Sequence, residues 1–170
     1  MSIRIEHPCA GVASIVLGAA GRRLTYRCEA DLHRVTAIDE FGTVVMAFGG
    51  YGRGLGRLNT PLDITFVRPE FFGEVLPVTG PDAVWLAVAD YGNRRVQLFE
   101  LDGAYVATLD TNDDRAIGAP CALAWRPPVL EVEGVEGRRV RVNLTAALLS
   151  EYTGIAPQPR EWLFPSARVN

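Results

Sequence analysis

The sequence predicts an all-β protein made of about three repeated units, each holding four short antiparallel strands. Three observations lead to this prediction. The chain matches itself at an offset of 61 residues, a proline begins each unit, and apolar runs of about four to eight residues alternate with Gly, Pro, Asp and Asn. Runs of this length are typical of strands, because those four residue types favour the turns between them.

The self-match is clearest between Glu29–Ile38 and Asp90–Phe99, and it continues through a turn into the next strand. The matched pairs are Glu29 with Asp90, Arg34 with Arg95, Gly42 with Gly103 and Val45 with Val106. A match that keeps its register across a turn indicates a repeated structural unit.

The unit starts are marked by Pro8, Pro61 and Pro120, which are 53 and 59 residues apart. In the middle unit the predicted strands are Leu62–Val67, Val84–Ala89, Arg95–Glu100 and Tyr105–Asp110. Gly103 fits the hairpin between the last two strands, because glycine readily adopts positive φ. Asp90–Arg94 is the predicted turn between the second and third strands, in which Asp90, Asn93 and Arg95 have a structural role.

The stretch Val88–Phe99, together with the preceding Gly56–Pro61, resembles an NHL repeat of the β-propeller family. The first unit is degenerate, with Leu32 where the family has asparagine, and the third keeps little beyond Pro120. The resemblance implies three four-stranded antiparallel propeller blades, which is half of a six-bladed ring, over residues 1–143. The expected blades span about 7–59, 60–118 and 119–143.

Residues 144–170 are expected to form a short C-terminal helix and a docking tail. Leu144, Leu148 and Tyr152 share one stripe of a helix over Thr145–Tyr152, and the apolar tail that follows is rich in proline.

The amino-acid composition limits the classes of function that the protein can have. The net charge of −3 and the pI near 5.4 disfavour binding of nucleic acid, and all 17 basic residues are arginine. Three cysteines, an odd number, indicate reduced thiols rather than a disulfide framework. The apolar run Pro8–Gly21 is too short to span a bilayer and lacks a preceding positive cluster. We therefore expect a cytoplasmic protein that does not enter a membrane.

Two segments supply the candidate binding residues. The glycine-rich segment Gly49–Gly56 fits no phosphate-binding motif and is predicted to connect two blades. The segment Arg68–Pro81 is an insertion in the repeat, either packed on its own blade or exposed as a contact surface. The candidate binding residues from these segments and from the second turn are Tyr51, Arg53, Arg57, Phe71, Phe72, Tyr91 and Arg94.

No catalytic residue, metal ligand or cofactor is predicted. His7 and His33 are isolated, and no serine lies in a nucleophile motif. A non-enzymatic binding scaffold for a protein or small molecule is the first hypothesis, on the strength of the family resemblance. A lyase-like or hydrolase-like propeller enzyme with a channel site, drawing on His7 and Asp63, is the second. Binding of single-stranded RNA is the third, and the acidic pI counts against it.

Three blades cannot close a ring, and their open ends are expected to expose apolar faces. Two copies related by a two-fold axis would supply six blades, so a homodimer is predicted. Ser2–Glu6 or Val140–Leu144 could then latch one blade to another. The alternative is that the C-terminal helix and tail cover the open side.

Overall fold

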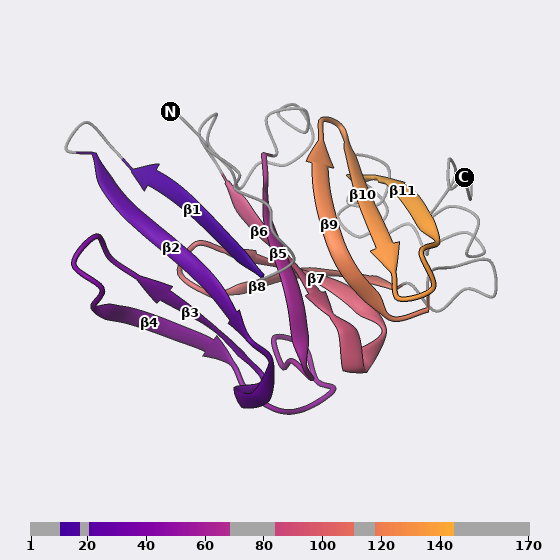
Figure 1. The fold of residues 1–170 in the computed structure, drawn as a ribbon, viewed down its shortest axis with the longest axis horizontal. Helices are drawn as coiled ribbons and strands as arrows, with labels where there is room; N and C mark the ends of the chain where they lie inside the picture. The colour runs from indigo at the N-terminus through magenta and orange to yellow at the C-terminus, as the bar shows by residue number, and fades with distance from the viewer. Residues whose placement is uncertain (1–10, 18–20, 69–83, 111–117, 145–170) are drawn as a thin grey trace.

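The computed structural model describes residues 11–17, 21–68, 84–110 and 118–144. Within these residues the protein is all-β, as the sequence predicted: eleven strands form three antiparallel sheets (Figure 1). None of the helical segments in this part of the chain is long and apolar enough to cross a membrane.

The sheets follow the chain in order. The first contains β1 (Val12–Leu17), β2 (Arg22–Glu29), β3 (Arg34–Ile38) and β4 (Val44–Gly49), paired in that order. The second contains β5 (Pro61–Val67), β6 (Trp85–Asp90), β7 (Arg95–Glu100) and β8 (Tyr105–Asp110). The third contains β9 (Pro120–Arg126), β10 (Val129–Gly134) and β11 (Arg139–Asn143), with β10 in the middle.

The middle unit matches its prediction closely. The bounds of β7 and β8 are those predicted, β5 begins one residue earlier, and β6 is shifted by one residue. Pro61 and Pro120 are the first residues of β5 and β9, where the missing N–H is tolerated. Pro8 lies outside the described residues.

The third unit differs from its expectation. Its described part has three strands instead of four. Val140–Leu144, considered as a latch to another blade, falls largely within β11, which pairs with β10 of the same sheet. The expected helix over Thr145–Tyr152, the tail and the insertion with Phe71 and Phe72 lie outside the described residues.

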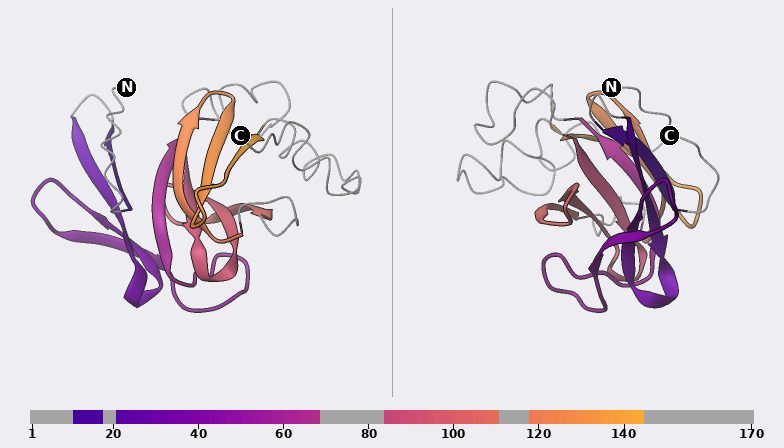
Figure 2. Two further views of the ribbon diagram at one scale, coloured as in Figure 1. Left: turned by 45° about the vertical axis from the view of Figure 1, so that its right-hand side comes forward. Right: turned by 90° about the vertical axis from the view of Figure 1, so that its left-hand side faces the viewer.

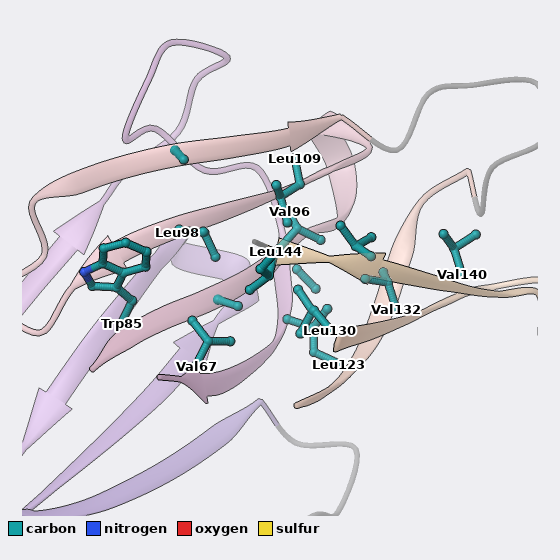
Figure 3. Close-up of a cluster of buried hydrophobic side chains, with 14 residues drawn as sticks. Val67, Trp85, Val96, Leu98, Leu109, Leu123, Leu130, Val132, Val140 and Leu144 are labelled. Atoms are coloured by element: carbon teal, nitrogen blue, oxygen red, sulfur yellow. The ribbon is translucent and has the colours of Figure 1, made fainter. Parts of the chain in front are cut away.

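The second sheet lies between the other two (Figures 1 and 2). Its face toward the first sheet contributes Ile64, Phe66, Leu86, Val88 and Phe99 to one buried cluster. Its opposite face contributes Val67, Trp85, Val96, Leu98 and Leu109 to a second cluster with the third sheet (Figure 3). Both faces of the second sheet are therefore buried, whereas the other two sheets each keep an outer face.

The outer face of the first sheet has polar groups on β1, β2 and β3 and the exposed apolar residues Val44 and Ala47 on β4. Ser14 and Thr25 share a hydrogen bond of 2.9 Å between their hydroxyl groups. Beside them, Glu29 accepts hydrogen bonds from Arg27, Arg34 and Thr36.

The outer face of the third sheet carries ion pairs. Arg126 and Arg141 pair with Glu131 at 3.0 and 3.6 Å, and Arg139 pairs with Glu133 at 2.7 Å. Each of these outer faces therefore carries charged groups, in contrast to the apolar faces expected at the open ends. The reason is strand alternation: in β2, β10 and β11 the apolar residues point inward and the charged residues between them point outward.

Candidate binding surface at one end of the sheets

The predicted turn between β6 and β7 is a short 3-10 segment, Tyr91–Asn93, followed by Arg94 in the left-handed region at φ 56° and ψ 46°. The first sheet contains the same turn. Ala30–Leu32 is a 3-10 segment there, and His33 follows it at φ 52° and ψ 37°. The self-match read from the sequence is thus a match of backbone conformation.

Asp90 is the centre of the second turn, and its side chain has no exposed surface. One carboxylate oxygen accepts a hydrogen bond from the Asn59 backbone N–H at 2.7 Å. The other accepts from Asn93 Nδ2 and Arg95 Nε, both at 2.8 Å, and from Gln97 Nε2 at 3.3 Å. A carboxylate can be buried at this position because a guanidinium and three further donors replace its water.

The same side chains hold the connecting loop, defined here as residues 50–60 between β4 and β5. The Arg95 guanidinium donates to the backbone oxygens of Arg53, Gly54 and Arg57 at 2.8–2.9 Å. Asn93 Nδ2 donates to the Gly52 oxygen at 2.7 Å. The loop is therefore fixed by polar side chains that come about 40 residues later in the chain.

Gln97 completes this attachment, and sequence reasoning missed it. Its Nε2 donates to the Arg57 oxygen at 2.6 Å, and its Oε1 accepts from the Gly56 N–H at 3.0 Å. The signal was present in the sequence, since a polar Gln97 two residues after Arg95 lies on the same face of a strand.

Gly92 lets the loop pass close to the turn. Its N–H donates to the Asn59 oxygen at 2.8 Å, and a Cβ at this position would lie 2.5 Å from Asn59 Cγ. Any side chain here would force the Asn59 side chain to move.

The loop and the two turns expose a mixed apolar and cationic surface, which we call the turn surface. It lies at the lower end of the sheets in Figure 1. Tyr51, Leu55 and Leu32 are 72%, 70% and 55% exposed. The exposed side chains of the turn surface are Asp31, Leu32, Tyr51, Arg53, Leu55, Arg57 and Arg94.

Tyr51 is oriented by His33. The two ring centroids are 4.9 Å apart with an interplanar angle of 60°. His33 is itself oriented, because its Nδ1 accepts a hydrogen bond of 3.0 Å from the Thr60 N–H.

Five of the seven candidate binding residues thus lie on the connecting loop or on the turn that holds it: Tyr51, Arg53, Arg57, Arg94 and the half-buried Tyr91. Phe71 and Phe72 lie outside the described residues. Leu32, His33 and Leu55 were not predicted as candidates.

Several titratable groups have a structural role. Burial and the nearby Asp102 carboxylate raise the pKa of Tyr26 to about 12, and its hydroxyl donates to the Leu101 oxygen at 2.8 Å. Burial and the Asp63 carboxylate raise the pKa of the Cys28 thiol. Both groups therefore remain uncharged near neutral pH.

Glu29 shows the opposite shift. Hydrogen bonds from Thr36 and Arg34, and then from Arg27, lower its pKa to about 2 against the opposing effect of burial. It is therefore ionised down to strongly acidic pH.

Asp63, the candidate for a channel enzyme, connects two sheets. Its oxygens accept hydrogen bonds from the backbone N–H groups of Ile64 at 2.9 Å and Leu123 at 2.8 Å. His7 lies outside the described residues. Among the residues that the structure does describe, no three His, Cys, Asp or Glu side chains are grouped as metal ligands would be.

Comparison of the chain with known protein-family models gives no match, and comparison with curated proteins finds no similar protein.

Proposed function

We propose that the protein is a non-enzymatic binding scaffold built from NHL-like propeller blades, and that its turn surface binds a protein partner. The observation that carries the proposal is a loop that is held rigidly and yet exposes Tyr51 and Leu55 to water. The side chains that fix this loop include a buried carboxylate and a half-buried guanidinium. Large apolar side chains on a fixed, exposed loop are typical of binding sites.

The charges on the turn surface indicate the chemistry of the partner. Arg53, Arg57 and Arg94 are exposed on it, and its exposed acidic residue is Asp31, in the first turn. Guanidinium groups bind carboxylates in a planar, bidentate geometry. The expected partner is therefore a peptide segment that carries Asp or Glu beside an aromatic or aliphatic residue. Because the loop is already fixed, little ordering entropy is lost on binding.

The proposal can be tested with a phage-displayed library of random peptides selected on the purified protein. We expect the selected peptides to be enriched in acidic and aromatic residues. Their affinity should fall at least about tenfold for Tyr51→Ala and for Arg53→Glu, because hot-spot aromatics and charge pairs each contribute more than about 1.4 kcal/mol. Val135→Ala is the control, since Val135 is 56% exposed in the turn between β10 and β11 and lies in neither the connecting loop nor its two turns.

Two results would contradict the proposal. One is a set of selected peptides whose binding is unchanged by both variants. The other is preference for single-stranded RNA, the alternative that the exposed Tyr51 beside two arginines favours. A labelled single-stranded RNA tests this directly, because its binding should fall steeply as salt is raised.

The homodimeric six-bladed ring remains a prediction, but its interface changes. The ends that would meet carry the Glu29 cluster and the ion pairs of the third sheet, so closure would join charged faces. At the first sheet, closure would also bury the exposed apolar residues Val44 and Ala47 of β4.

A further inference from the structure

β4 is an outer edge strand without charge. Within the described part of the chain it pairs with β3 and with no other strand. Val44 and Val45 are 58% and 51% exposed, and Ala47 is exposed as well. No charged residue occurs between Glu40 and Arg53.

The apolar surface extends beyond the edge itself. Phe41, in the turn before β4, is 84% exposed. Phe41, Val45 and Leu24 line a hollow of about 380 Å³ together with the polar residues Arg22, Asp39 and Glu40.

The other two outer edge strands differ from β4. In β8, Ala107 and Leu109 are buried, and Val106 packs against the second cluster. In β11, Arg139 and Arg141 are exposed and pair with glutamates of β10. Buried or charged edge strands rarely pair with another chain, whereas a flat, uncharged, apolar edge strand does so readily.

We propose that β4 pairs antiparallel with β4 of a second copy of this chain across a two-fold axis, so that the two first sheets become one. The chemistry of the edge favours a second copy of the chain as the partner. An antiparallel edge is complementary to itself, because its free N–H and C=O groups meet the same groups in reverse order. Self-pairing of β4 places no like charges together, whereas self-pairing of β11 would bring Arg139 and Arg141 near their own copies.

The expected dimer is weak. A six-residue edge with its turn falls below the roughly 1,200 Å² that stable interfaces bury. Backbone hydrogen bonds and coverage of Phe41, Val44 and Val45 are its main contributions. We therefore expect a dissociation constant for the dimer in the micromolar range.

The test is light scattering coupled to size-exclusion chromatography over loading concentrations from about 5 to about 500 µM. The mass of the full chain should rise from 18.5 kDa toward twice that value. Ala47→Lys should keep the mass at 18.5 kDa throughout, because it places a charge on the pairing edge. Thr108→Lys is the matched control, at the equivalent position of β8, and should dimerise like the unaltered chain.

A mass that stays at 18.5 kDa at the highest concentration overturns the proposal. A dimer that survives Ala47→Lys but is lost in Arg141→Glu also overturns it, because the second copy would then bind an outer face. If circular dichroism shows that Ala47→Lys does not fold, Val44→Lys gives the same readout at a second exposed site of β4. Failure of peptide binding at the turn surface would leave this result unaffected.

Discussion

The same turn occurs in the first and second sheets, but the two turns rest on different side chains. In the second sheet Asp90 is fully buried and holds the connecting loop through Asn59. In the first sheet Glu29 keeps 18% of its side chain exposed and binds Arg34 at 2.6 Å on the outer face. The two turns therefore share one backbone conformation. Their central carboxylates differ in burial, because different parts of the chain pack against each turn.

The sheet faces show the same divergence. Leu86, Val88 and Phe99 of the second sheet are buried against the first sheet. At the offset of 61 residues the first sheet has Thr25, Arg27 and Ile38 at these positions. Two of the three apolar residues of the second sheet are thus replaced by polar ones in the first sheet, at positions where no described sheet packs.

Replacing the central carboxylates, Asp90 in the second sheet and Glu29 in the first, should give the largest difference in unfolding free energy between the two turns. We expect Asp90→Ala to lower the free energy of unfolding by about 3–5 kcal/mol, because it removes the carboxylate that is paired with the largely buried Arg95 and that accepts four hydrogen bonds. Glu29→Ala should cost about 1 kcal/mol, since two of its three partners, Arg27 and Arg34, are exposed to water. Urea unfolding measures both, and equal losses would show that the two turns are equivalent in energy.

A smaller difference in the loss of stability is expected at the second residue of each 3-10 segment, which is Gly92 in the second sheet and Asp31 in the first. Gly92→Ala should cost about 1–3 kcal/mol, because the new methyl group would overlap Asn59. Asp31→Ala, at the matched exposed position of the first sheet, should change stability by less than about 0.5 kcal/mol. Thermal unfolding followed by circular dichroism compares the two, and a neutral Gly92→Ala would mean that the loop is not held against the turn.

The smallest expected effect depends on pH and belongs to the first sheet. The folded pKa of Glu29, about 2, lies below its ordinary value of 4.5, so the ionised carboxylate stabilises the fold above pH 4.5. This contribution is lost as the pH falls toward 2. Glu29→Gln should therefore be less stable than the unaltered chain at pH 6 and nearly equal to it at pH 2. A stability difference that does not change with pH would show that the carboxylate charge has no part in this turn.

The binding surface could be foreseen only in part. Tyr51, Arg53 and Arg57 stood out by residue type in an exposed, glycine-rich segment, and Tyr91 and Arg94 by their place in a turn. That Arg95 and Gln97 fix the loop could not be read locally, because their partners are about 40 residues away. Leu32 and Leu55 were missed because an isolated leucine gives no sign of being exposed.

The sequence by itself determined the strands and turns of the middle unit. The signals for β7, β8 and the Asp90–Arg94 turn are local: apolar runs end at Asp, Asn and Gly, and those residues favour the observed turn conformation. The tertiary structure alone decided which strand faces are buried, that the Asp90 side chain is buried, and that β4 has no second partner strand among the described residues. These outcomes depend on which sheet packs against which, and that packing joins residues far apart in the chain.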